Sequence, residues 1–255
     1  MPYVSVKGID IYYESTNDEA MPVVFIHGAG GSSQRWSEQL LNLKNSQYNL
    51  MALDLPGHGK SGGNLLPSIS DMAEFIADFV GVLALGEFIL VGHSMGGAIA
   101  QEFALQYQEK VKGLILIGTG AKLRVSQQIL GTLAAGQMPF RDADHLFGSY
   151  TPDHQRKVAL REMNQVPPTL YLADFTACNE FDRTLAIQEI EVPCLIVVGD
   201  EDVMTPVRYS QFLHTHLVNS QLRIINGTGH MCNMEKPAEV TETIESFLAQ
   251  FVTRL

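Results

Sequence analysis

Short apolar runs alternate with amphipathic segments over residues 1–120. The apolar runs are rich in β-forming residues and have the length of strands buried on both faces. They lie at 22–27, 48–53, 88–91 and 114–117. The spacing of apolar residues between them predicts helices over 33–43, 71–85 and 96–107. Two more β-rich stretches, 3–6 and 9–13, flank Lys7-Gly8 and predict an N-terminal hairpin. Strands that alternate with helices indicate a parallel sheet covered on both faces.

The alternation stops between residues 121 and 187. This stretch predicts helices over 125–135 and 152–165, but it contains no convincing buried strand. The alternation then resumes, with strands at 193–198 and 221–225 and helices at 207–217 and 237–251. We therefore predict one α/β core domain, formed by residues 1–120 and 188–255, with a helical insertion at 121–187. The alternative is that the inserted helices simply pack on the flank of the sheet.

The composition is that of a globular protein with a substantial core. The chain has 255 residues, of which 45% are hydrophobic and 18% are charged. Its 17 Lys+Arg and 28 Asp+Glu give a net charge of −11, which argues against a nucleic-acid partner.

The cysteines and the apolar runs bear on the cellular compartment. Three cysteines without regular spacing predict neither a disulfide framework nor a metal site. The first residues lack the basic and apolar regions of a signal peptide, and no apolar run approaches the ~20 residues of a membrane helix. We expect a cytoplasmic protein with reduced thiols and no membrane partner.

The strongest chemical signal is the segment Gly92-His93-Ser94-Met95-Gly96, which lies between a predicted strand and a predicted helix. In this context G-x-S-x-G forms a sharp turn that exposes a nucleophilic serine. Glycines two residues before and after the serine relieve the crowding of that turn. The following helix directs its N-terminal amides toward charge that develops beside Ser94. The alternative is a glycine-rich turn with an incidental serine.

A serine hydroxyl needs a base, and the base needs an orienting acid. Of the eight histidines, His230 follows the last predicted strand, where a parallel sheet places functional groups. The loop after 195–198 offers three carboxylates, Asp200, Glu201 and Asp202. The resulting order of nucleophile, acid and base is the one found in α/β-hydrolases. For the oxyanion, we expect the backbone N–H groups of Met95 and Ala29, with Gly30 as the next choice.

With these residues assembled, the chain resembles the α/β-hydrolase superfamily over nearly its whole length. The matching pieces are His27-Gly28, 54–61 (DLPGHGKS), Gly92–Gly97, Gly199-x-x-Asp202 and Gly229-His230. The resemblance implies a mostly parallel eight-stranded sheet, a helical lid at 121–187, and Asp202 as the acid. Segment 175–182 is similar to one in small carboxylesterase and enol-lactonase-like members. The resemblance thus implies a serine hydrolase that cleaves an ester or lactone of a small molecule, without a metal or other cofactor.

The substrate pocket is expected to be lined by the inserted helices. The predicted lining residues are Gly30, Leu130, Leu133, Met138 and Phe147. The four apolar residues among them could equally form the core of the lid. Arg124 is a candidate contact for an anionic substrate, although a lone arginine is more often solvated.

Several other functions are compatible with parts of the pattern. The same triad could serve a C–C bond hydrolase, a thioesterase, a perhydrolase or a catalytically weak ligand-binding receptor. A dinucleotide site is suggested by Gly28-Ala29-Gly30-Gly31 followed by Asp54 at the end of the next strand, but Ser33 replaces the third glycine of that motif. No H-E-x-x-H or other clustered ligand set supports metal hydrolysis.

Overall fold

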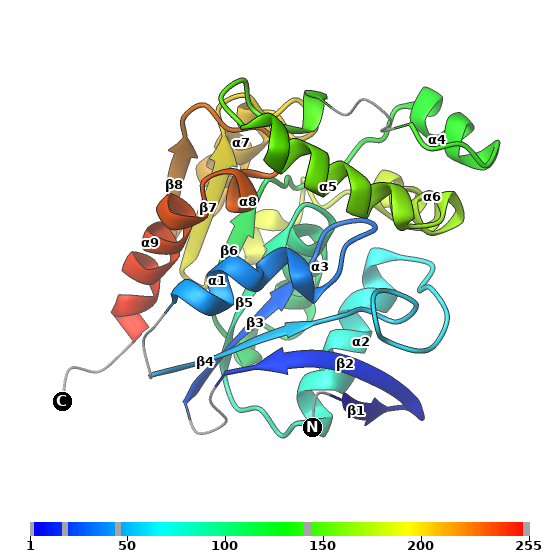
Figure 1. The fold of residues 1–255 in the computed structure, drawn as a ribbon. Helices are drawn as coiled ribbons and strands as arrows, with labels where there is room; N and C mark the ends of the chain where they lie inside the picture. The colour runs from blue at the N-terminus through cyan, green and yellow to red at the C-terminus, as the bar shows by residue number, and fades with distance from the viewer. Residues whose placement is uncertain (1–2, 17–19, 44–46, 140–143, 252–255) are drawn as a thin grey trace.

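The computed structural model describes residues 3–16, 20–43, 47–139 and 144–251. Within these residues, eight strands form one sheet in the order β1-β2-β4-β3-β5-β6-β7-β8 (Figure 1). The strands are β1 (Tyr3–Val6), β2 (Ile9–Ser15), β3 (Met21–Ile26), β4 (Tyr48–Leu53), β5 (Phe88–His93), β6 (Val111–Ile117), β7 (Cys194–Gly199) and β8 (Ser220–Ile225). β1 pairs antiparallel with β2, and β2 pairs antiparallel with β4, whereas the remaining pairs are parallel. The predicted hairpin and the mostly parallel sheet are both confirmed.

The apolar runs become strands because the centre of the sheet is covered on both faces. Every residue of β4, β5 and β7 is buried, whereas the edge strand β8 has one fully buried residue, Ile225. Parallel strands buried on both sides read as continuous apolar runs rather than as alternating ones.

Helices cover both faces of this sheet. On one face lie α2 (Ile69–Val82), α3 (Met95–Gln106) and α7 (Val207–His216), whose apolar residues join one core cluster. On the other face, α1 (Ser37–Asn42) and α9 (Pro237–Leu248) lie together, in front of the sheet in Figure 1. Trp36 and Phe247 belong to the core cluster on this second face. None of the described helices is long and apolar enough to cross a membrane.

Between β6 and β7 the chain forms α4 (Gln127–Ala134), α5 (Asp153–Gln165) and α6 (Pro168–Glu180). These helices lie over the carboxyl end of the sheet, at the top of Figure 1. They share a separate apolar cluster that includes Leu133, Met163 and Tyr171. Helix α6, which begins with Pro168 at its first position, was not among the predicted helices. The assignment of 121–187 as a lid remains a prediction, and residues 140–143 of that range lie outside the described residues.

The remaining short helical elements connect these units. They are η1 (Ser33–Trp36), η2 (Gln108–Lys110), η3 (Asp144–Leu146), η4 (Ile187–Glu189), α8 (Cys232–Glu235) and η5 (Ala249–Phe251).

Candidate active site

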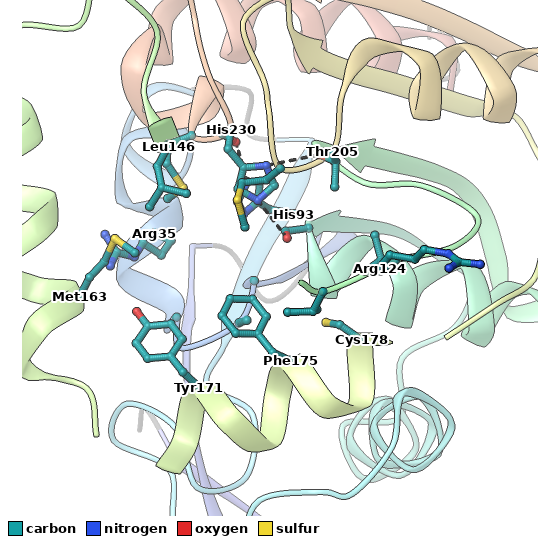
Figure 2. A pocket seen from close by; sticks show the side chains of 18 residues that line it. Arg35, His93, Arg124, Leu146, Met163, Tyr171, Phe175, Cys178, Thr205 and His230 are labelled. Carbon is teal, nitrogen blue, oxygen red and sulfur yellow. Dashed lines mark hydrogen bonds between the residues drawn. The ribbon is translucent and has the colours of Figure 1, made fainter. Parts of the chain in front are cut away.

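The loops that follow β3, β5, β7 and β8 meet at the carboxyl edge of the sheet. They bring Ser94, Asp202 and His230 together, although 136 residues separate Ser94 from His230 in the chain. Parallel strands end at the same edge of a sheet, so residues just beyond those ends become neighbours. Helix α6 faces this edge and carries Tyr171 and Phe175, which lie across from His230 (Figure 2).

Ser94 occupies a strained turn between β5 and α3. Its backbone has φ 54° and ψ −115°, a conformation that non-glycine residues rarely adopt. Two hydrogen bonds hold it there: the Ser94 N–H donates to Ile117 O at 2.9 Å, and the Thr119 hydroxyl donates to Ser94 O at 2.9 Å. Strain of this kind persists where the surrounding structure enforces it, most often at functional sites.

The glycines of the turn allow backbone segments to approach one another closely. A Cβ on Gly92 would lie 2.1 Å from the carbonyl oxygen of Gly96. A Cβ on Gly96 would lie 2.3 Å from the carbonyl oxygen of Ile26, at the end of β3. The structure therefore has no room for a side chain at either position.

We expect Gly96→Ala to lower the free energy of unfolding by about 3 kcal/mol, because a backbone segment rather than a flexible side chain must move. In a chain of this size the melting temperature should fall by roughly 6–12 °C. Gly131→Ala in α4 is the matched control, since a Cβ there meets nothing within 4 Å. It should leave stability unchanged or raise it by up to about 1 kcal/mol. Equal melting temperatures for the two variants would contradict the close approach at Gly96.

The side chains of the three candidate residues form a continuous hydrogen-bonded row. His230 Nε2 lies 3.0 Å from Ser94 Oγ, and His230 Nδ1 lies 2.9 Å from Asp202 Oδ2. When Nδ1–H donates to the carboxylate, Nε2 is left to accept the serine proton. The main chain of His230 is also held, because its N–H donates to Leu146 O at 2.9 Å.

Asp202 is the carboxylate that the structure places next to His230. It is 4% exposed, and its Oδ1 accepts the N–H groups of Met204 and Thr205 at 2.9 and 2.8 Å. Burial opposes ionisation, but the charge and hydrogen bond of His230 together with the Thr205 bonds outweigh it, so the pKa of Asp202 is lowered. Its two rivals point elsewhere: Asp200 accepts the Gly227 N–H, and Glu201 accepts two hydrogen bonds from Ser149.

The loop after β3 forms a tight turn beside Ser94. The Gly31 N–H donates to Gly28 O at 3.0 Å, and the same oxygen lies 2.9 Å from His27 Nδ1. Because a trans peptide directs its N–H opposite to its C=O, these bonds orient the N–H of Ala29 away from them. The Gly30 N–H, in contrast, donates to Asp174 at 2.8 Å. The Gly30 N–H is therefore not free to donate to an oxyanion. Gly30 was also predicted to line the pocket, but it is not among the lining residues.

Two other histidines near the site are neutral and structural. Burial, reinforced by a neighbouring histidine, lowers the pKa values of His27 and His93 to about 3. His27 Nε2 accepts the Leu55 N–H at 3.2 Å, so its Nδ1 carries the proton. His93 Nε2 lies 2.9 Å from His230 O and helps to hold the main chain of the candidate base.

Ser94 and His230 open into a cavity of about 790 Å³, a volume that includes its open mouth. Its apolar lining residues are Leu123, Val125, Leu146, Met163, Phe175, Met204 and Met231. Leu130, Leu133, Met138 and Phe147, which were predicted to line the pocket, are not among the residues that line this cavity. These four residues instead pack into the apolar cluster shared by the inserted helices, because an inserted helical layer needs a core of its own.

Sequence reasoning missed two polar residues of the pocket, Arg35 and Tyr171. The Arg35 side chain is 11% exposed and donates to Glu162 at 2.9 Å. Its position in η1, four residues after Gly31 of the glycine-rich turn, was the available signal. Arg124, which was considered instead, is exposed at the pocket rim, and its guanidinium points away from the centre in Figure 2.

Cys178 also lines the pocket and carries a thiol, which is a potential nucleophile. Burial raises the pKa of its thiol far above the ordinary value, so the thiol stays protonated and unreactive. Within the described residues, no three His, Cys, Asp or Glu side chains are grouped as a metal site would require.

Asp54 does not behave as the ribose-binding acid of a dinucleotide site. It is 1% exposed, and its carboxylate accepts the N–H groups of Ser33 and Lys60 at 2.6 and 2.7 Å. This carboxylate connects the 54–61 loop to the start of η1. Its oxygens are already used by the protein, which argues against the dinucleotide interpretation.

Beneath the turn after β3 lies a buried pair formed by His58 and Asp174. His58 Nε2 is 3.0 Å from Asp174 Oδ2, and the two residues are 2% and 0% exposed. Burial lowers the pKa of His58, but the hydrogen bond and charge of Asp174 outweigh it, so the net pKa is raised.

This raised pKa predicts a pH-dependent stability. The contribution of the pair is fully present below the unfolded value of 6.5 and is lost as the pH rises through the higher folded pKa of His58. His58→Gln should lower the free energy of unfolding by about 3 kcal/mol near pH 6, because Asp174 keeps a buried charge without a counter-ion. Urea titrations should show that the difference between wild type and variant shrinks at alkaline pH. A difference that is constant with pH would contradict the ion pair, and His154→Gln at an exposed site of α5 is the control.

The fold and the serine-acid-histidine arrangement define a hydrolase-type protein. The chain belongs to the alpha/beta hydrolase family, whose model matches residues 23–243. The family prediction is thereby confirmed.

Individual relatives agree with this assignment. A solved thermophilic esterase is 31% identical with a TM-score of 0.86, and the match covers 97% of this chain and 96% of the esterase. The enol-lactonase from Burkholderia xenovorans LB400 has the same fold, with a TM-score of 0.85, 19% identity and coverage of 97% and 100%. The dihydrolipoyllysine-residue acetyltransferase component of the acetoin cleaving system from Cupriavidus necator is 36% identical over 96% of this chain and 68% of its own length. The acetyltransferase activity in that name refers to that longer protein and is not assigned to this chain.

Proposed function

We propose that this protein is a serine hydrolase that cleaves a carboxylic ester or lactone of a small molecule. The observation that carries the proposal is the row Ser94–His230–Asp202, with its two distances of 3.0 and 2.9 Å at the floor of a cavity. A hydroxyl within reach of a correctly oriented imidazole is the arrangement that acyl transfer requires.

In the proposed reaction, Ser94 Oγ attacks the carbonyl carbon while His230 Nε2 takes the hydroxyl proton. Asp202 holds His230 in the required tautomer and stabilises the imidazolium that forms. The N–H groups of Met95 and Ala29 receive the oxyanion of the tetrahedral intermediate. His230 then protonates the leaving alcohol, and an acyl-enzyme forms. A water molecule, activated by the same base, releases the acid and restores Ser94.

The lining of the cavity supports an apolar acyl or alcohol group. Methionine and leucine side chains line the cavity together with Ser94. Phe175 projects into it from α6 (Figure 2). A cavity of this size lies in the range of small-molecule sites.

We propose that residues 121–187 act as the lid over this cavity and that residues 1–120 and 188–255 form the catalytic core. The Arg35 side chain adds one polar contact, for which a substrate carbonyl or hydroxyl is suited.

The direct test is turnover of p-nitrophenyl esters from acetate to octanoate and of simple γ- and δ-lactones. A fluorophosphonate should abolish the turnover, because Ser94 Oγ displaces its fluoride, and the peptide that contains Ser94 should gain the mass of the phosphonyl group. Turnover with the label on another residue would overturn the nucleophile assignment. Failure of the folded protein to cleave any ester or lactone would overturn the proposed bond class, because the cavity is already open to these small substrates.

A further inference from the structure

Asp174 is a buried carboxylate that the reaction above does not use. It lies on α6 of the insertion and is 0% exposed. Its Oδ2 accepts the N–H of Gly30 at 2.8 Å and contacts His58 Nε2 at 3.0 Å. One oxygen thus joins three segments that are far apart in sequence: α6, the turn after β3 and the loop after β4.

The counter-ion of Asp174 is His58. Both ring nitrogens of His58 face acceptors, since Nδ1 lies 3.0 Å from Pro56 O and Nε2 faces Asp174. A ring that donates from both nitrogens is an imidazolium. Around it, the neutral ring of His27 lies at 4.9 Å and the buried carboxylate of Asp54 contributes a further negative charge. Without this cation, the charge of Asp174 would oppose the negative charge that develops in the adjacent oxyanion hole.

Helix α6 also restrains Gly30 sterically. Gly30 has φ +64°, and a Cβ at this position would lie 2.1 Å from the ring of Tyr171. Tyr171 and Asp174 are three residues apart, so they lie on the same side of α6. The ring covers the α-carbon of Gly30, while the carboxylate holds its N–H.

The cost of this arrangement is informative. Asp174 Oδ1 is buried and has no hydrogen-bond partner among the described residues. An unpaired buried carboxylate oxygen destabilises a protein. The contact between α6 and the Gly30 turn is therefore formed at a cost in stability.

We propose that Asp174 is a positioning residue for the oxyanion hole. It fixes the Gly30 peptide and so the direction of the adjacent Ala29 N–H, with His58 as its counter-ion. Helix α6 of the insertion therefore supports the oxyanion hole through its contact with the Gly30 peptide. Asp174 itself does not touch the reacting atoms. This inference rests on the function proposed above, because it assigns Ala29 as an oxyanion donor.

The kinetic test compares Asp174→Ala, Asp174→Asn and the exposed control Asp153→Asn on α5. Asp174→Ala should lower kcat by about 10- to 100-fold and change KM by less than about threefold, because the donor is lost mainly in the transition state. Asp174→Asn should be intermediate, since its amide oxygen can still accept the Gly30 N–H. Wild-type kcat in folded Asp174→Ala, or a rise in KM alone, would overturn the proposal.

A second measurement does not depend on turnover. An alkylboronic acid forms a tetrahedral adduct on a serine and occupies the oxyanion hole, whereas the matching carboxylic acid does not. Asp174→Ala should weaken the boronate by about 10- to 100-fold and leave the affinity for the carboxylic acid unchanged. Equal losses for both ligands would show a merely structural role and overturn the proposal.

The two measurements separate this inference from the proposed function. Absence of ester and lactone turnover in wild type, with the boronate result as expected, would reject the bond class and retain the positioning role. If Asp174→Ala does not fold, the double variant Asp174→Asn with His58→Gln removes both charges together. That variant should show a selective loss of boronate affinity that is smaller than the loss expected for Asp174→Ala, and an unchanged affinity would overturn the proposal.

Discussion

Ser94→Ala is expected to lower kcat for ester hydrolysis by about 10⁵- to 10⁶-fold while the protein remains folded. The variant lacks the oxygen that lies 3.0 Å from His230 Nε2, so no acyl-enzyme can form. What remains is the contribution of binding and of the oxyanion donors. The residual kcat is measured from the hydrolysis of a p-nitrophenyl ester, after subtraction of the uncatalysed rate.

The control for this experiment is Ser68→Ala. Ser68 caps α2 by accepting the Asp71 N–H at 3.1 Å, far from the site in sequence and role. Its loss should cost about 1 kcal/mol of stability and leave kcat unchanged. Retention of a tenth of the wild-type kcat in Ser94→Ala would contradict the nucleophile assignment.

Asp202→Asn is expected to lower kcat by about 10³- to 10⁴-fold. The asparagine oxygen should remain with the N–H groups of Met204 and Thr205, which now hold Asp202 Oδ1. Its NH₂ group then faces His230 Nδ1 and donates to it. The proton of the ring moves to Nε2, where it prevents His230 from accepting the proton of Ser94.

Asp200→Asn is the matched variant, because Asp200 lies two residues away in the same loop and is exposed. Its oxygen accepts the Gly227 N–H, and the amide oxygen of an asparagine can accept the same hydrogen bond. We expect a change in kcat of less than about threefold, in line with substitutions outside the reacting groups. The reverse ranking of the two variants would move the acid to Asp200.

The two sets of variants have different kinetic signatures. We expect Ser94 and Asp202 to act on proton transfer and bond formation, so their loss should remove turnover almost completely. Asp174 acts through the Gly30 peptide, so its loss should spare the proton relay and reduce only the stabilisation of the oxyanion. A combination of Asp174→Ala with Asp202→Asn tests whether the two effects are independent.

The structural neighbours restrict the range of possible substrates less than the residues that line the cavity do. An esterase at 31% identity and an enol-lactonase at 19% share this fold, and the same fold serves many reactions. We expect the polar Arg35 and Tyr171, which stand within an otherwise apolar lining, to help to distinguish substrates. Comparison of an apolar ester with one bearing a terminal hydroxyl would measure their contribution.

Much of the fold and the candidate catalytic row could be predicted from the sequence because both depend on local patterns. Buried parallel strands are continuous apolar runs, so β4 matches its predicted range of 48–53. Ser94 stands in a turn that requires glycines on both sides, and His230 lies in the loop that follows β8, the last strand of the sheet. These signals lie within a few residues of the groups that they identify.

The residues that line the pocket and the contacts of Asp174 could not be predicted from the sequence, because both depend on tertiary structure. Whether Leu133 or Phe175 faces the cavity depends on how the inserted helices rotate against one another, and both surfaces are apolar in sequence. The environment of Asp174 depends on the approach of α6 to a turn 144 residues away, for which no local pattern exists. Sequence by itself thus determined the sheet and the candidate catalytic row, since short-range spacing encodes them. Packing between distant segments decided the substrate lining and the buried ion pair, since long-range contacts create them.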